Sequence, residues 1–192
     1  MTADPLALFQ SWWTQALEVE LGEPSAMTLA TATSDGIVSA RTVLLRGVDT
    51  DGFDFFTNYN SRKGRQLAEN PRAALVLHWG TWHRQVCIAG AVERLNDERS
   101  DAYFSSRPRG HQIAAWASEQ STVIEDRAVL EERVLAFERE FAERDVPRPP
   151  HWGGFRVRPE TIEFWEGQMD RLHNRFLYRR ASDGWTVERL AP

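Results

Sequence analysis

The chain has 192 residues, of which 42% are hydrophobic, enough to bury the core of one domain spanning residues 1–192. Its formal net charge of -5 argues against a nucleic-acid-binding protein, because such proteins neutralise phosphates with an excess of lysine and arginine. The single cysteine excludes an internal disulfide and favours a reducing, cytoplasmic setting.

The N-terminal part of the chain predicts a helix followed by an antiparallel meander. Asp4-Pro5 supplies an N-cap and a first-turn proline, and apolar residues then recur at helical spacing until Gly22. Short glycine-containing turns separate the strands expected next, which span residues 27–33, 37–45 and 53–58. The pattern therefore changes from helix to sheet.

A short helix and a hairpin are predicted to follow. The helix spans residues 61–69 and ends at Asn70-Pro71, because proline disfavours helical geometry in the residue before it. The hairpin pairs residues 73–79 with residues 84–95. Cys87 lies in an apolar run of the second strand and is expected in the core.

The C-terminal half is predicted to be helical and then to return to strands. Asn96 can cap a helix that runs to Ser106, and residues 126–145 have the pattern of an amphipathic helix packed on a sheet. The strands expected after the proline-rich loop span residues 154–158, 161–165, 175–179 and 185–190. Strands joined mostly by short turns, with helices inserted between groups, indicate an α+β domain built on an antiparallel sheet or barrel.

Several common functional sites are absent from the sequence. It contains no glycine-rich nucleotide-binding loop, no Gly-x-Ser-x-Gly motif and no pair of cysteines for zinc. The five histidines lack the spacing of a helical metal site, so no metal is expected. Neither a signal peptide nor an apolar run of about 18 residues occurs, so no membrane association is expected. Eight tryptophans and ten phenylalanines favour a surface that is hidden by pairing with a second copy of the chain.

The most informative local feature runs from Asn58 to Lys63, where a strand leads into a helix. The first turn of this helix offers free N–H groups, the Ser61 hydroxyl and the cations Arg62 and Lys63, which together can hold a phosphate. The alternative is that Ser61 only caps the helix while both cations face water. For an isolated motif, this alternative is favoured.

Three further basic clusters are candidates for binding anions. Arg41 lies in a strand, where burial would demand an anionic partner, although an outward-facing arginine fits the pattern equally well. If residues 171–175 are extended, alternation brings Arg171, His173 and Arg175 to one face, which could equally be a solvated charged face. The last cluster, near a helix end, comprises Tyr103, Arg107, Arg109 and His111. An acidic protein that keeps such clusters is predicted to bind phosphorylated ligands.

The sequence resembles the pyridoxamine 5′-phosphate oxidase family from about Asp4 to Pro192. The motifs behind the resemblance occur in the order found in the family. They are residues 40–45, 57–58 with 61–63, 84–86, 103–104 with 106–109, Trp116 with Ser118 and residues 120–121, residues 152–155, and residues 164–165 leading to residues 171–173. Agreement on this scale is improbable by chance.

The resemblance implies an antiparallel split β-barrel with peripheral helices that forms a homodimer, with two FMN sites at the interface, each built from both chains. In this family Arg62 and Lys63 would hold the FMN phosphate, which favours the phosphate-binding interpretation of the motif around Ser61. The residues expected to bind FMN are Arg41, Thr42, Val43, Leu44, Phe56, Thr57, Ser61, Arg62, Lys63, Gln85, Gln120, Ser121, Trp165 and Arg175.

The resemblance also implies the activity, which is oxidation of pyridoxamine or pyridoxine 5′-phosphate to pyridoxal 5′-phosphate. A hydride passes from the substrate to the flavin, and O2 reoxidises the flavin with release of H2O2. Arg171 and His173 match the substrate-side pair of the family and are expected to be catalytic. The residues expected to bind the substrate are Arg46, Tyr103, Arg107, His111, Arg171 and His173.

Departures from the family pattern leave two other functions open. Arg46 and His111 replace the usual lysine and serine at the substrate phosphate, Asn174 replaces an aspartate, and the sequence lacks the N-terminal arginine and tyrosine segment of typical members. Arginine differs from lysine in reach and geometry, so the site could favour a carboxylate. One alternative is therefore a flavin oxidase of a dihydroaromatic carboxylate, as in phenazine biosynthesis. The other is a non-catalytic flavin-binding or heme-utilisation protein on the same barrel.

Overall fold

The computed structural model describes residues 4–192 and contains helices and strands in alternating groups. The helices are α1 (Pro5–Val19), α2 (Arg62–Glu69), α3 (Asp97–Ser106), α4 (Arg109–Ala117) and α5 (Arg127–Glu140), with 3-10 turns η1 (Gly80–Trp82) and η2 (Met169–Arg171). The strands are β1 (Ala26–Ala32), β2 (Val38–Leu44), β3 (Gly47–Asp49), β4 (Gly52–Asn58), β5 (Arg72–Trp79), β6 (Arg84–Arg94), β7 (Trp152–Glu166), β8 (Asn174–Ala181) and β9 (Gly184–Arg189).

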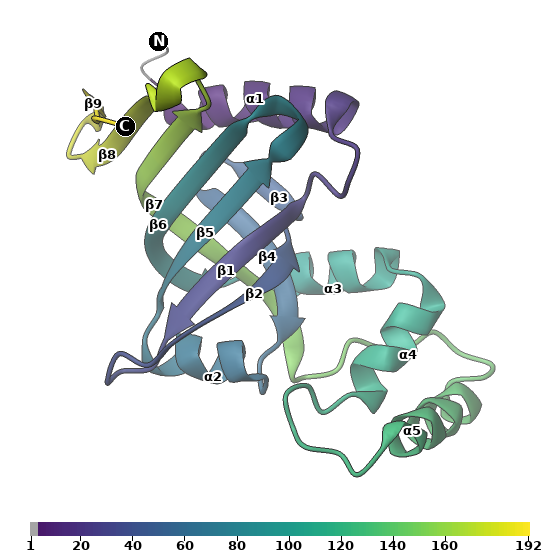
Figure 1. Cartoon of the computed structure of the whole chain (residues 1–192). Coiled ribbons are helices and arrows are strands. Elements are labelled where there is room, and N and C mark those ends of the chain that lie inside the picture. The colour runs from purple at the N-terminus through teal and green to yellow at the C-terminus, as the bar shows by residue number, and fades with distance from the viewer. Residues whose placement is uncertain (1–3) are drawn as a thin grey trace.

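All the strands belong to one antiparallel sheet with the order β2-β1-β5-β6-β7-β4-β3, and β8 pairs with β7 while β9 pairs with β8. The sheet curls into a split barrel (Figure 1). Helices α1 and α2 lie at opposite ends of the barrel, and α3, α4 and α5 form a separate group beside it. This is the α+β split barrel with peripheral helices that the sequence predicts.

The barrel core is apolar because alternate side chains of the strands point inward. Leu75, Leu77, Val86 and Ile88 on the central hairpin are almost fully buried, as the period of two in a strand requires. Helix α1 closes one end of this core by inserting Phe9, whose ring meets Phe53 edge-on at 4.8 Å between centroids. Apolar packing inside the barrel therefore stabilises it without a contribution from the residues of a ligand site.

The group of α3, α4 and α5 has its own apolar cluster, which includes Phe104, Ile113, Phe141 and Trp152. The sequence predicts that the helix now seen as α5 packs on a sheet, and this prediction is wrong. Helix α5 packs mainly on α4, and it contributes no fully buried residue within its bounds. The apolar side chains within the helix are at most partly buried, and the residue most deeply buried in this contact is Phe141, just beyond the end of the helix.

The strands predicted near the proline-rich loop also need correction. The two strands expected at residues 154–158 and 161–165 are one continuous strand, β7, which passes through Pro159. The proline is tolerated because the register between β6 and β7 shifts at this point and Pro159 lies opposite Gly90. A Cβ atom on Gly90 would lie 1.9 Å from the Arg158 carbonyl oxygen, so only glycine permits this approach.

Cys87 is half-buried rather than part of the core. It lies on the opposite face of β6 from Val86 and Ile88, where the Gln85 amide donates a hydrogen bond to its Sγ at 3.3 Å. Burial raises the pKa of the Cys87 thiol, with a further contribution from Glu163. The raised pKa favours the neutral thiol over the thiolate.

None of the helices formed by residues 4–192 is both long and apolar enough to traverse a bilayer. Within the same residues, no three His, Cys, Asp or Glu side chains gather in a way that could hold a metal ion.

Candidate functional site

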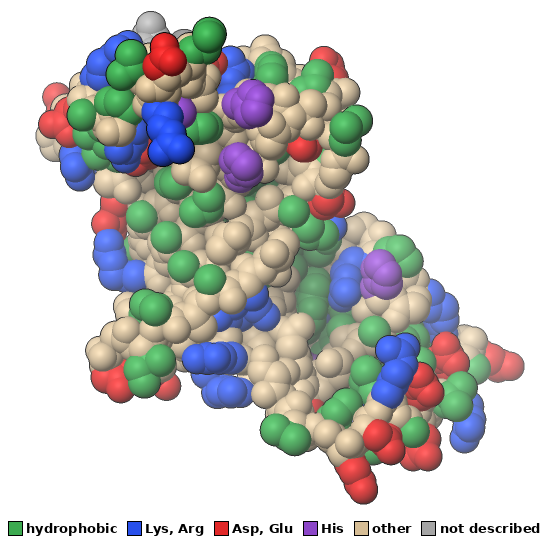
Figure 2. Space-filling model, viewed as in Figure 1, with side chains coloured by type: hydrophobic (Ala, Val, Ile, Leu, Met, Phe, Trp, Pro, Cys, Tyr) green, Lys and Arg blue, Asp and Glu red, His purple; other side chains and the backbone are tan. Residues whose placement is uncertain are grey.

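A cavity of about 650 Å³ opens between the barrel and the group of α3, α4 and α5. Figure 2 shows this hollow, with lysine and arginine side chains along its edges. It is lined by Arg41, Thr42, Val43, Leu44, Arg46, Phe56, Thr57, Asn58, Lys63, Tyr103, Arg107, His111, Ala114, Ala115, Ser118, Gln120 and Trp152. Most of the predicted cofactor and substrate residues are thus brought together, although they come from segments far apart in the chain.

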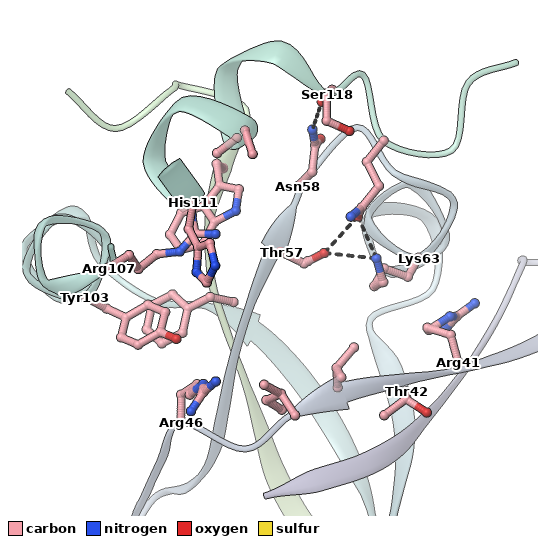
Figure 3. A pocket seen from close by; sticks show the side chains of 17 residues that line it. Arg41, Thr42, Arg46, Thr57, Asn58, Lys63, Tyr103, Arg107, His111 and Ser118 are labelled. Carbon is pink, nitrogen blue, oxygen red and sulfur yellow. Dashed lines mark hydrogen bonds between the residues drawn. The ribbon is translucent and has the colours of Figure 1, made fainter. Parts of the chain in front are cut away.

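One end of the cavity is built around Lys63. Its side chain is only 8% exposed. Its Nζ donates hydrogen bonds to Thr57 Oγ1 at 3.0 Å and Gln120 Oε1 at 2.8 Å (Figure 3), and a further one to Ser61 Oγ at 3.3 Å. Ser61 also caps α2 by accepting a hydrogen bond from the Gly64 N–H. Ser61 therefore caps the helix and also helps to hold Lys63, which is buried and does not face water as the alternative interpretation requires.

The close seating of α2 explains why Lys63 is buried. A Cβ atom on Gly64 would lie 2.1 Å from the Tyr59 carbonyl oxygen, so the helix could not approach this far with another residue. Burial and the nearby Arg41 lower the pKa of Lys63 to about 8. A buried ammonium held only by neutral groups is costly, and an anion in the cavity would remove that cost.

Arg41 faces the same end of the cavity from β2. Its guanidinium donates to the Leu29 carbonyl oxygen at 3.1 Å, to Thr31 Oγ1 at 2.7 Å and to Ser39 Oγ. These partners are all neutral. Burial, and then the charge of Arg62, lowers the pKa of Arg41. The interpretation of Arg41 as an outward-facing arginine is therefore wrong.

The other end of the cavity contains Arg46, Tyr103, Arg107 and His111 (Figure 3). The Arg107 guanidinium lies 4.6 Å from the Trp152 ring centroid. Among residues 4–192, its Nη1 atom is buried and has no hydrogen-bond partner. A buried donor of this kind calls for an acceptor supplied by a ligand. Burial also lowers the pKa of Arg107.

The lining of the cavity carries an excess of positive charge. Of the residues that line it within the described part of the chain, none is acidic. Among residues 4–192, no salt bridge to an acidic side chain is formed by Arg41, Arg46, Lys63 or Arg107. A cavity with a cationic group at each end, and with Phe56 and Tyr103 stacked in its wall at 4.0 Å between ring centroids, suits ligands with an anionic group and a flat ring.

Arg62, Arg109 and Ser121 do not line this cavity. Arg62 is exposed and follows Ser61, whereas Ser121 directly follows Gln120. Arg109, which the sequence analysis grouped with Tyr103 and Arg107, donates instead to the carbonyl oxygens of Phe141 and Arg144. It therefore stabilises the packing of α4 against the end of α5.

A second group of predicted site residues lies elsewhere on the same chain. Gln85, Trp165 and Arg175 are direct cross-strand neighbours on β6, β7 and β8. His173 lies against Trp165, with 4.7 Å between ring centroids. None of these four residues lines the cavity, and neither does Arg171. We call Gln85, Trp165, Arg171, His173 and Arg175 the β7–β8 group.

The prediction that Arg171, His173 and Arg175 alternate along one strand is wrong. Strand β8 begins only at Asn174, and Arg171 belongs to the turn η2, where its φ is 60° and that of Asp170 is 55°. Such left-handed backbone breaks the alternation. His173 is instead oriented by the Gln168 N–H, which donates to its Nδ1 at 3.2 Å, and Arg175 donates to Glu163 Oε1 at 2.8 Å.

The sequence analysis missed Asn58, Ala114, Ala115, Ser118 and Trp152 as cavity residues. Asn58, Ser118 and Trp152 were within quoted motifs, and the Asn58 amide donates to the Ser118 carbonyl oxygen at 3.3 Å. The alanines come from α4, which was not predicted as a helix. The signal for this helix was weak, because Gly110 lies in its first turn.

A split barrel with a cationic cavity between its sheet and a helical group has a site that suits phosphorylated or carboxylated ring compounds. A family model described as pyridoxamine 5′-phosphate oxidase matches residues 13–140, and one described as the pyridoxine 5′-phosphate oxidase C-terminal dimerisation region matches residues 152–192. The chain belongs to the pyridoxamine 5′-phosphate oxidase family. The resemblance seen in the sequence motifs is thereby confirmed.

Individual relatives agree with this assignment. The pyridoxine/pyridoxamine 5′-phosphate oxidase of Acaryochloris marina is 53% identical, with 100% of this chain and 88% of the relative covered. That of Burkholderia multivorans is 56% identical, with 98% and 89% covered. The crystal structure of PhzG from Burkholderia lata 383 with tetrahydrophenazine-1-carboxylic acid superposes with a TM-score of 0.93 at 34% identity and covers 100% of this chain and 94% of that one.

Proposed function

We propose that the chain is a homodimeric FMN-dependent oxidase that converts pyridoxamine or pyridoxine 5′-phosphate to pyridoxal 5′-phosphate with O2 as the acceptor. The observation that carries this proposal is the cavity with a cationic group at each end and no acidic lining residue within the described chain. The relatives at 53% and 56% identity bear the name of this activity.

The residues at the Lys63 end fit the phosphate of FMN. Lys63 and Arg41 offer charged donors that have only neutral partners, and Arg62 adds a third charge beside them. Thr42, Val43, Leu44, Phe56, Thr57 and Gln120 would then contact the rest of the cofactor. When bound, FMN supplies the hydride acceptor and passes the electrons to O2, with release of H2O2.

The residues at the Arg107 end fit the phosphate of the substrate. Arg46, Tyr103, Arg107 and His111 would hold this anion, and the unpartnered Arg107 Nη1 would gain an acceptor. With the FMN phosphate held at one end and the substrate phosphate at the other, the flavin ring and the substrate ring would lie in the region of the cavity lined by Phe56 and Trp152. The chain's main contribution is then to bind and orient the reactants.

The β7–β8 group would complete the site of the partner subunit. Four of its members, Trp165, Arg171, His173 and Arg175, lie in the region matched by the dimerisation model. None of them reaches the cavity of its own chain. In His173, Nδ1 accepts from the Gln168 N–H, so in the neutral ring the hydrogen is on Nε2, which could donate a hydrogen bond that positions the substrate. Arg171 would add a positive charge beside it.

Comparing substrates under air tests the function. We expect H2O2 release to be fastest with pyridoxamine or pyridoxine 5′-phosphate, and anaerobic addition of either compound to bleach the yellow flavin. Rapid oxidation of a dihydroaromatic carboxylate with negligible turnover of the vitamin phosphates would contradict the proposal. The identity of 34% to PhzG, against 53% and 56% for the vitamin oxidases, favours the first outcome.

FMN affinity is expected to fall as the pH rises above about 8. The pKa of Lys63 is lowered to about 8 by burial and by Arg41, and a bound phosphate would raise it again by favouring the ammonium. Between these two pKa values binding must take up a proton, so the dissociation constant should rise by up to about tenfold per pH unit. The phosphate itself, with a second pKa of about 6, stays ionised there.

Quenching of FMN fluorescence by the apoprotein, titrated from about pH 7 to about pH 10, measures this dependence. The matched control is Lys63→Arg, whose guanidinium stays charged over the whole range. An equal slope in both proteins would show that Lys63 is not the titrating group.

A further inference from the structure

We propose that Arg99 and Asp54 are positioning residues that set the spacing between the two sides of the substrate-phosphate end of the cavity. The inference rests on the proposed function, since it assigns that end to the substrate. Figure 3 shows Arg46 on one side, with Tyr103 and Arg107 on the other. Arg46 precedes β3, whereas Tyr103 and Arg107 belong to α3 and its C-cap.

Asp54 connects the barrel strands around Arg46. Its carboxylate is only 2% exposed and accepts hydrogen bonds from Arg156 Nε at 2.7 Å and Arg156 Nη2 at 3.0 Å. These bonds raise the pKa of Arg156, so its guanidinium stays charged. The Asp54 carbonyl oxygen also accepts from the Arg46 N–H at 2.9 Å. One residue therefore fixes the backbone of Arg46 and anchors it to β7.

Arg99 connects the same carboxylate to α3. Its Nη2 donates to Asp54 Oδ2 at 2.7 Å, and its Nη1 lies 3.3 Å from Asp49 Oδ2 at the end of β3. Arg99 is in the first turn of α3, one turn before Tyr103 and two turns before Arg107. The network thus joins the strand beside Arg46 to the helix that supplies the opposing side chains.

Neither Arg99 nor Asp54 lines the cavity, so an effect on substrate binding must act through the placement of other residues. An error of about 1 Å in the placement of binding groups is enough to cost much of their effect. The Lys63 end does not share this network, because Lys63 bonds to Thr57, Ser61 and Gln120. Loss of the network should therefore weaken substrate binding and spare FMN.

The test is steady-state kinetics of the FMN-loaded variants Arg99→Gln and Asp54→Asn with pyridoxamine 5′-phosphate. We expect KM to rise about tenfold for each variant, while kcat and the FMN dissociation constant stay within about twofold of wild type. Arg99→Lys should restore part of the lost affinity. The matched control is Arg72→Gln, which removes an exposed ion pair with Glu160 elsewhere on the barrel and should leave KM unchanged.

The possible outcomes are distinct. Unchanged KM in Arg99→Gln, with active wild-type protein, would overturn the positioning role alone. A parallel loss of kcat, FMN affinity and melting temperature in Arg99→Gln would also overturn it, because that pattern means a general structural role. Absence of turnover by the wild-type protein would instead overturn the proposed function. Arg99 is half-exposed, so its replacement keeps the test usable if Asp54→Asn fails to fold.

Discussion

Replacing Lys63 by methionine is expected to weaken FMN binding about 100-fold, so that the purified variant is colourless. Methionine retains much of the length of the side chain but removes the charged donor. The lost donor is buried and lies among neutral oxygen atoms that no carboxylate compensates. The substitution should therefore remove cofactor affinity while relieving the cost of a buried charge, and the apoprotein should remain folded.

Titration of FMN into the apoprotein, followed by flavin fluorescence, measures this effect. Arg65→Met is the matched control, because Arg65 is an exposed cation on the same helix and does not line the cavity. It should bind FMN as wild type does. If Lys63→Met bound FMN with wild-type affinity, the cofactor phosphate would have to be held elsewhere.

Mixed dimers of Lys63→Met and His173→Ala chains are expected to recover activity that neither variant has alone. His173→Ala should slow flavin reduction roughly 100-fold, because the substrate loses a hydrogen bond from Nε2 that positions it for hydride transfer. Each mixed dimer pairs the intact Lys63 of one chain with the intact His173 of the other, which restores one of the two sites. With random mixing, half of the dimers are mixed, so the yield is about a quarter of wild-type activity.

The experiment requires refolding or co-expression of the two chains, followed by an H2O2 assay. The control mixes Lys63→Met with Arg41→Gln, two substitutions in the same cavity, and should show no rescue. His173→Ala dimers should still bind FMN, because Lys63 and Arg41 are intact. Activity of the first mixture that only equals the sum of its parents would mean that each site lies within one chain.

Local signals in the sequence predicted the secondary structure where capping and alternation agree. Asp4, Ser61, Asn96 and Asp126 each cap the helix that begins after them. The hairpin of β5 and β6 follows from strict alternation. By contrast, β3 is too short to have a period. The continuity of β7 through Pro159 depends on a register shift that only the neighbouring strand reveals.

Most of the charged residues of the cavity were predicted individually, but the shape of the cavity was not. The motif around Ser61 and the cluster of Tyr103 and Arg107 were found from charge and capping, yet their separation depends on how far the sheet curls. The error at Arg171 has a different origin, since alternation was assumed across a turn with left-handed backbone. The site residues are divided between the cavity and the β7–β8 group. This division follows from the three-dimensional fold, and no local sequence pattern predicts it.

Strand β7 gives the proposed dimer a direct mechanical link between its two centres. Trp152, its first residue, lines the cavity of its own chain, and Trp165, its last but one, belongs to the β7–β8 group that would complete the partner's cavity. The path between them is about 40 Å along a strand that is paired with β6 over most of its length. In the proposed dimer, two such strands related by the twofold axis would connect the two centres through backbone alone. A shift of the backbone at one centre would then reach the other along a hydrogen-bonded sheet and not through loops.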